Sequence, residues 1–229
     1  MHNIFFNVSS TSFSVKNLEK FDKPALYLYL KSFIFFLLIP ALFLQSCASS
    51  SSTRFYILSS LDRHDLSNRN DNSKDEGVIG ILPVKIPKYI DRSNIVTRIS
   101  QNEIKFSDFH LWASSLKDAF SRVLDENLSI LLRTNNIVHY PWRNNRLVNH
   151  LISVDVIRFD GKPGENVTLI ARWSVFNKSK NNLVFMKKSS IDVPLTLVGY
   201  KALVEAQSNA VEQLSRLIAD SIISIRKMN

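Results

Sequence analysis

Two long stretches of the chain repeat their apolar residues every three or four positions. The first, residues 108–132, follows a possible N-cap at Ser107 or Asp108, and its apolar stripe starts at Trp112. The second, residues 200–226, lies close to the end of the sequence. This spacing places the apolar side chains on one face of a helix. The sequence therefore predicts two amphipathic helices.

Three stretches between the predicted helices alternate apolar and polar residues with a period of two. Residues 148–156, 167–175 and, more weakly, 183–194 have this pattern, which is typical of strands with one buried face. Turn-rich segments separate them, so we expect an antiparallel meander. Shorter predicted strands are residues 54–58, 78–84, 95–99 and 103–106, the last two forming a hairpin.

This set of elements predicts an α/β fold with a single core. We expect a two-layer sandwich, in which a largely antiparallel sheet is covered on one face by two long helices. Leu169, Ala171 and Trp173 share one face of the second long strand, and this face is expected to point at the helices. The almost wholly polar residues 59–76 are expected to form a solvated loop.

The strongest apolar run precedes this domain and covers the twelve residues from Phe33 to Leu44. A helix of that length spans about 18 Å, less than the roughly 30 Å core of a bilayer. Lysines precede the run and small polar residues follow it, which is the order of a secretory signal. The next residues, Leu44 to Ala48, read LQSCA and resemble a bacterial lipobox, in which a signal peptidase cuts before the cysteine.

Cys47 is the single cysteine, so an internal disulfide and a cysteine-based zinc site are both excluded. The lipobox resemblance implies a diacylglycerol on the Cys47 thiol and an N-acyl chain such as palmitate, with no other cofactor. The alternative is a buried cysteine beside a membrane anchor. The predicted organisation is a signal peptide over residues 1–46, an acylated Ser-rich tether over 47–53, and one domain over 54–229.

Composition narrows the possible functions. Lys and Arg outnumber Asp and Glu by 29 to 20, and removal of residues 1–46, with four lysines and two acidic residues, leaves a net charge of +7. Such a charge suits anionic lipid, acidic proteins or nucleic acid, and export argues against nucleic acid. The five scattered glycines exclude the common nucleotide-binding loops. No catalytic or metal-ligating constellation is visible, so we do not expect an enzyme.

Several motifs occur in the order and spacing of one known family. Together they resemble the PqiC-type ABC-transport auxiliary lipoprotein family, over roughly residues 54–226. The stretches that carry the resemblance are Phe55–Leu58, Leu82–Arg92, Ile95–Arg98, Trp112–Ala113, Tyr140–Trp142, Arg158–Gly161 and Ala171–Ser174, with Tyr200, Leu203 and Leu214 in the terminal helix.

This resemblance implies a lipoprotein of the Gram-negative envelope that works with an MCE-type phospholipid transporter and supports envelope integrity. Such a protein is neither the ATPase nor the channel. It is expected at the outer membrane, lipid-anchored and facing the periplasm, because Ala48 rather than Asp follows the cysteine. The implied partners are the periplasm-spanning MCE-domain protein, its inner-membrane subunit, membrane lipid and further copies of the chain.

The segment from Pro83 to Arg92 is the candidate partner surface. It lacks a regular period and is rich in Pro, Lys and Tyr, which suits an exposed loop; a rigid turn that ends a strand is the alternative. A stand-alone envelope lipid-binding lipoprotein is the alternative function, and it requires an apolar cavity between sheet and helices. The candidate surface residues are Pro83, Lys85, Pro87, Lys88, Tyr89 and Arg92.

Lipidation at Cys47 is directly testable. Cys47→Ser removes the thiol that forms the thioether, so the variant should stay uncleaved or unlipidated at the inner membrane. Globomycin should likewise cause the precursor of the unaltered protein to accumulate. Membrane fractionation and mass determination measure both effects, and normal outer-membrane fractionation of the Ser variant would contradict the prediction.

Overall fold

The computed structural model describes five stretches of the chain, residues 27–36, 52–62, 77–142, 148–178 and 181–228. The chain divides into two units, Met1–Ser50 and Ser51–Asn229. In the first unit residues 27–36 form a helix. Cys47 and most of the predicted loop over 59–76 lie outside the described residues. No helix among the described stretches is long and apolar enough to cross a membrane.

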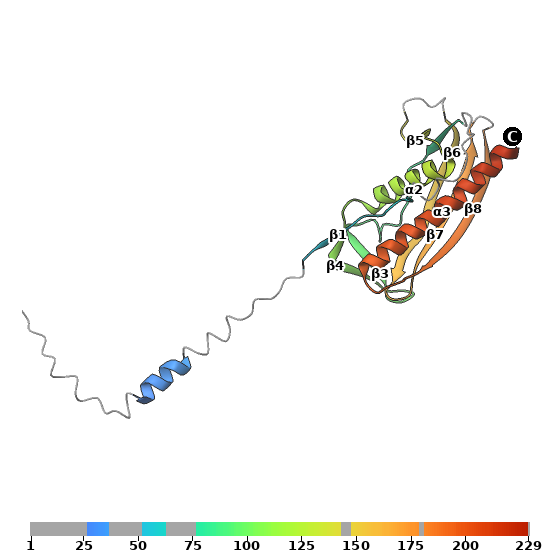
Figure 1. Ribbon diagram of the computed structural model, residues 1–229. Helices are drawn as coiled ribbons and strands as arrows, with labels where there is room; N and C mark the ends of the chain where they lie inside the picture. The colour runs from blue at the N-terminus through green and yellow to red at the C-terminus, as the bar shows by residue number, and fades with distance from the viewer. Residues whose placement is uncertain (1–26, 37–51, 63–76, 143–147, 179–180, 229) are drawn as a thin grey trace, which may run out of the picture. The chain divides into compact units, whose positions relative to one another are not determined.

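The second unit contains an eight-stranded sheet and two long helices within its described residues (Figure 1). In chain order the elements are β1 (Arg54–Tyr56), β2 (Val78–Ile81), β3 (Asn94–Arg98), β4 (Ile104–Trp112), α2 (Leu116–Leu132), β5 (Ile137–His139), β6 (Val148–Lys162), β7 (Asn166–Asn177), β8 (Asn182–Pro194) and α3 (Tyr200–Met228).

The predicted meander and hairpin are confirmed. β6, β7 and β8 pair antiparallel in sequence order, and β3 pairs antiparallel with β4. The long strands make the sheet largely antiparallel, as predicted, but the sheet also contains parallel pairings of its short strands. β1 pairs parallel with β4, and β2 pairs parallel with both β5 and β6. These short strands are joined by long connections rather than tight turns, which permits parallel pairing.

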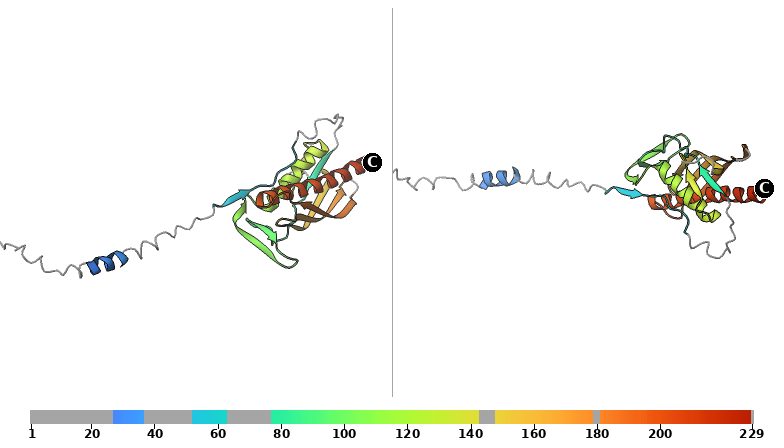
Figure 2. Two further views of the ribbon diagram at one scale, coloured as in Figure 1. Left: turned by 60° about the horizontal axis from the view of Figure 1, so that its bottom comes forward. Right: turned by 90° about the horizontal axis from the view of Figure 1, so that it is seen from above.

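α3 confirms the second predicted helix and packs along β6, β7 and β8. α2 lies against α3 and reaches the sheet through Phe120, whose ring meets Phe159 of β6 edge-on at 5.5 Å between centroids. The right view of Figure 2 shows the two helices close together. The prediction that both helices cover one face of the sheet is not confirmed, because the backbone of α2 approaches α3 most closely and not the strands.

The first helix begins later than predicted. Residues 108–112 belong to β4, whose Trp112 N–H donates to the carbonyl of Ser93 over 2.7 Å. Ser115 caps α2, because its hydroxyl accepts from the Asp118 N–H. Trp112 is buried in the strand, so its fit to the helical spacing was misleading. The three-residue β5 had no predicted counterpart, since a strand that short shows no period.

The predicted inner face of β7 is confirmed. Leu169, Ala171 and Trp173 are buried, and α3 packs on this strand. The indole N–H of Trp173 donates to the hydroxyl of Ser189 over 3.1 Å, and its ring stacks on Phe185. Trp173 thus fills the core and satisfies its one polar group at the same time.

Truncating this side chain should cost much of the domain's stability. Trp173→Ala leaves a large cavity and is expected to lower the free energy of unfolding by about 3–5 kcal/mol. Trp173→Phe keeps most of the ring but loses the hydrogen bond, so it should lose less. Urea unfolding followed by circular dichroism measures both, and a loss below about 1 kcal/mol for the Ala variant would contradict this account of the core.

Candidate functional site

A fully buried carboxylate, that of Asp160, joins β6 to two earlier segments of the chain. The Arg98 guanidinium at the end of β3 donates to it twice, over 2.8 Å to Oδ1 and 2.6 Å to Oδ2. Arg158 donates to Oδ1 over 2.9 Å, and the Tyr89 hydroxyl donates to Oδ2 over 2.9 Å. We call Tyr89, Arg98, Arg158 and Asp160 the Asp160 cluster.

The local structure of β6 explains how these groups meet. Arg158 and Asp160 lie two residues apart, just after an irregularity in the pairing with β7 that follows Val156. The next residue, Gly161, pairs with Thr97 of β3, which brings Arg98 alongside. A Cβ on Gly161 would collide with the Leu203 side chain of α3, so only glycine allows the helix to pack this closely here.

The cluster is electrostatically matched. Burial alone would raise the pKa of Asp160, but hydrogen bonds from Arg98, Arg158 and Tyr89 outweigh burial and lower it. Burial, followed by the charge of Asp160, raises the pKa of Tyr89 to about 12. The hydrogen bond to Asp160 raises the pKa of Arg98. Near pH 7 Asp160 is therefore ionised and the Tyr89 hydroxyl is a neutral donor, so the cluster is suited to holding structure rather than to proton transfer.

The Pro83–Arg92 segment is a rigid turn, held in place by backbone hydrogen bonds and by the Tyr89 side chain. The Lys85 N–H donates to the Val154 carbonyl over 3.0 Å, and the Lys85 carbonyl accepts from the Val156 N–H over 2.9 Å. Further along, the Ile90 and Asp91 N–H groups both donate to the carbonyl of Pro87. Ile90 and Val84 are buried beneath the turn. The segment therefore has features of both predicted alternatives, an exposed loop and a rigid turn, since it is ordered and still faces solvent.

The six predicted surface residues divide into two groups. Pro83, Lys85, Lys88 and Arg92 are exposed, whereas Pro87 and Tyr89 are half-buried. Tyr89 is turned toward Asp160 and positions the turn instead of forming its outer surface. The Arg92 guanidinium lies over the ring of Phe106 in β4, 3.8 Å from the ring centroid, which restricts where its charge can sit.

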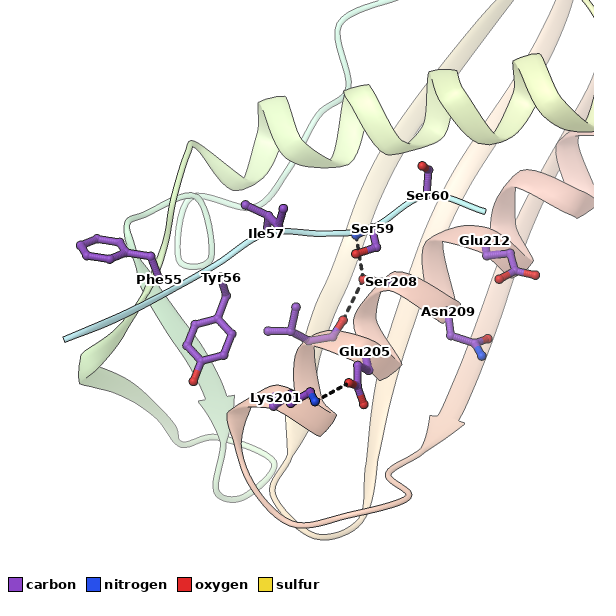
Figure 3. A pocket seen from close by; sticks show the side chains of 11 residues that line it. Phe55, Tyr56, Ile57, Ser59, Ser60, Lys201, Glu205, Ser208, Asn209 and Glu212 are labelled. Carbon is purple, nitrogen blue, oxygen red and sulfur yellow. Dashed lines mark hydrogen bonds and ion pairs between the residues drawn. The ribbon is translucent and has the colours of Figure 1, made fainter. Parts of the chain in front are cut away.

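A groove of about 510 Å³ lies between α3 and the chain from Phe55 to Ser60. Figure 3 shows this chain passing between α2 and α3. The Ser59 N–H donates to the Ser208 hydroxyl over 3.1 Å. The wall formed by the chain is partly apolar, and the wall formed by α3 carries Lys201, Glu205, Ser208, Asn209 and Glu212. Sequence reasoning missed this groove, because its two walls are far apart in the sequence.

An aromatic contact fixes the strand at the mouth of the groove. The Tyr56 hydroxyl and the Nδ1 atom of His110 are 2.7 Å apart, and the His110 ring stacks on Tyr200 with 3.9 Å between centroids. Burial and the neighbouring charge of Arg54 lower the pKa of His110. A neutral His110 therefore joins β1 and β4 to the first residue of α3.

Clusters of metal-binding side chains are absent from the described stretches. No group of three or more His, Cys, Asp or Glu side chains within them could hold a metal ion. Asp125 pairs with His139 over 2.9 Å at a partly exposed site, but no third group joins them to complete a triad among the interactions seen.

A mixed α/β domain that follows a lipobox-like cysteine has the organisation of a lipoprotein. Comparison with known families makes the assignment specific. The chain belongs to the family of ABC-type transport auxiliary lipoprotein components, whose model matches residues 59–219. The matched range contains the whole Asp160 cluster and the Pro83–Arg92 turn.

Solved structures share the fold. A crystal structure of an uncharacterized protein is 19% identical, with a TM-score of 0.62, over 75% of this chain and 99% of that one. The crystal structure of protein XCC0632 from Xanthomonas campestris is 14% identical, with a TM-score of 0.60, over 76% of this chain and 98% of that one. At these identities the likeness shows the fold alone. No curated protein matches the chain.

The Asp160 cluster should make the domain sensitive to acid. Because the folded-state pKa of Asp160 lies below its unfolded value of about 3.9, its stabilisation is present above that pH and is lost as the pH falls through the folded pKa. Asp160→Asn should cost about 3–5 kcal/mol near neutral pH, since it leaves two guanidinium groups without their carboxylate.

Urea unfolding of the unaltered protein and of Asp160→Asn at pH 7 and pH 3 measures this. The difference in the free energy of unfolding between the two proteins should be smaller at pH 3 than at pH 7. Asp155→Asn is the matched control, because the Asp155 carboxylate is about half exposed and lies 3.9 Å from the Arg172 guanidinium. This substitution should change stability little at either pH. A pH-independent difference for Asp160→Asn would contradict the assignment.

Proposed function

We propose that this protein is an outer-membrane-anchored auxiliary subunit of an MCE-type intermembrane phospholipid transport system, where it docks the periplasm-spanning component. Membership of the auxiliary lipoprotein family supports a transport role. The observation that carries the docking step is the rigid Pro83–Arg92 turn, which presents basic side chains to solvent from a backbone fixed by β6 and Asp160.

Rigidity is what makes this turn a good docking element. A surface that is already ordered loses little conformational entropy when a partner binds. Lys85 and Lys88 are exposed, and Arg92 is held over Phe106, so the turn offers positive charge in a defined arrangement. Electrostatic complementarity of this kind mainly sets encounter rate and specificity. We therefore expect an acidic surface on the MCE-domain partner.

The remaining parts of the proposal concern the anchor and the assembly. Lipid on Cys47 would retain the domain at the outer membrane, facing the periplasm, and the Ser-rich residues after it would act as a tether. Several copies of the chain would receive one partner, which in turn connects to the inner-membrane subunit. No cofactor beyond the covalent lipid is proposed.

The alternative function is a stand-alone envelope lipid-binding lipoprotein. The groove between the Phe55–Ser60 chain and α3 favours it, because Phe55, Ile57 and Val204 give that groove an apolar part. The groove is open to the outside and has charged residues on its α3 wall, unlike the apolar cavity between sheet and helices that this function was expected to need. Docking is therefore the better-supported proposal.

Charge reversal on the turn tests docking. Lys85→Glu combined with Lys88→Glu should weaken binding to the purified MCE partner at least about tenfold, because like charges then face each other. Folding should be unaffected, since exposed charges contribute little to stability. The control is Lys187→Glu with Lys188→Glu, an equal charge change on exposed residues of β8, which should leave binding unchanged. A pull-down with a thermal melt of each variant measures both quantities.

Tyr89→Phe separates orientation from charge. It removes the hydrogen bond to Asp160 and leaves every charge in place, so weaker binding would show that the turn must be held rigid. Its stability should fall by about 1 kcal/mol. Full binding by the double Lys variant would rule out this surface, and failure of any MCE protein to bind the unaltered chain would favour the stand-alone lipid carrier.

A further inference from the structure

Apolar side chains cover the outer face of β1 and the adjoining part of β4. Phe55 is 65% exposed and Ile57 is 59% exposed, while Tyr56 between them turns inward to His110 and Leu58 is buried. Phe55 lies opposite Leu111 in the parallel pairing, so their side chains share a face, and Phe109 is exposed nearby. A short edge strand with this composition is unusual on a soluble surface.

The loop before α3 adds two more apolar side chains at the same end of the domain. Val198 is 87% exposed, and Leu197 beside it is also exposed. Two residues later, Tyr200 stacks on His110, which contacts Tyr56. Figures 1 and 2 show β1 and the first turn of α3 close together in each view. The tether-end patch consists of Phe55, Ile57, Phe109, Leu197 and Val198.

The position of the patch in the chain indicates what covers it. Phe55 follows Cys47 by only eight residues, and a fully extended chain of that length reaches about 27 Å. If lipid holds Cys47 at a membrane surface, the patch can never be far from that surface. Such a tether gives a high effective concentration, so even a weak affinity for lipid would keep the patch bound.

We propose that the tether-end patch lies in the interface of the membrane that holds the lipid anchor, with its aromatic and aliphatic side chains among the lipid headgroups. This inference rests on the lipidation of Cys47 in the proposed function. Exposed aromatic and branched side chains are the groups that partition into this region. The contact makes the domain lie against the membrane in one orientation, with β1 and the start of α3 facing the lipid.

The charged side chains around the patch define what drives this contact. Arg54 precedes Phe55 and Asp108 precedes Phe109, and both charged side chains are exposed. Lys201 and Glu205 are also exposed and line the same groove as Phe55 and Ile57. The opposing charges largely offset each other. Burial of apolar surface must therefore supply the binding energy, and the contact should depend little on anionic lipid or salt. Partner binding by the basic Pro83–Arg92 turn (the docking turn) should, in contrast, depend on salt.

A single-cysteine label tests the proposal, because a lipidated Cys47 leaves no free thiol. Full-length Val198→Cys is purified in its lipidated form, labelled with an environment-sensitive nitrobenzoxadiazole dye, and reconstituted into vesicles of phosphatidylethanolamine and phosphatidylglycerol. Parallel vesicles contain phospholipid brominated near the headgroup, which quenches the dye only on contact with lipid. Leu183→Cys is the matched control, since it is 51% exposed at the start of β8, the opposite end of the strand that leads to Val198.

We expect brominated lipid to reduce the fluorescence at position 198 about twofold and to leave position 183 unchanged. Replacing Phe55 and Ile57 with Ser should weaken the quenching at position 198. Quenching should persist when phosphatidylglycerol is replaced by phosphatidylcholine. Loss of quenching on that replacement would contradict an apolar contact.

Other outcomes overturn the proposal in distinguishable ways. A mass without acyl chains on the purified protein would overturn the anchor itself, and this inference with it. A lipidated protein with no quenching would overturn the patch alone. A blue-shifted dye without bromine quenching would show that protein covers the patch, either a second copy or a bound peptide, and would equally overturn a membrane contact.

Discussion

The buried carboxylate of Asp160 is the interaction on which the arrangement of the domain depends. An ionised side chain with no exposed surface is tolerable only where donors replace water, and here Arg98, Arg158 and Tyr89 do so. Because these donors come from β3, β6 and the Pro83–Arg92 turn, satisfying one charge fixes the positions of three segments. The orientation of the basic turn is thus a consequence of core electrostatics.

The end of the domain next to the tether depends on a different contact. His110 stands between Tyr56 and Tyr200, so the three-residue β1 is fastened to α3 as well as to β4. Pairing with a single neighbouring strand is by itself a weak constraint on so short a strand. A firm β1 keeps the point where the tether joins the domain at a fixed place beside α3.

The sequence predicts the elements that are long enough for their hydrophobic period to be recognised. The meander and α3 run for twelve residues or more, and their alternation or helical stripe is unambiguous. The predicted start of α2 was wrong, because Trp112 fits a helical stripe. In the structure Trp112 belongs to β4, and its N–H bonds to the carbonyl of Ser93. Tyr89, Arg98, Arg158 and Asp160 all stand in the family-like motifs, yet their meeting depends on the pairing of Thr97 with Gly161, a tertiary contact that no local pattern contains. The groove was missed for the same reason.

β4 links the two surfaces on which the proposals rest. Arg92 of the docking turn lies over Phe106, and Phe109 of the tether-end patch follows three residues later, at most about 10 Å along the strand. If the patch rests in the lipid interface, the docking turn must lie near the membrane and not on the side of the domain that faces away from it. A partner that spans the periplasm would then bind the basic turn close to the bilayer. Docking and the membrane contact of the patch would together place the end of the partner where lipid has to enter or leave the membrane.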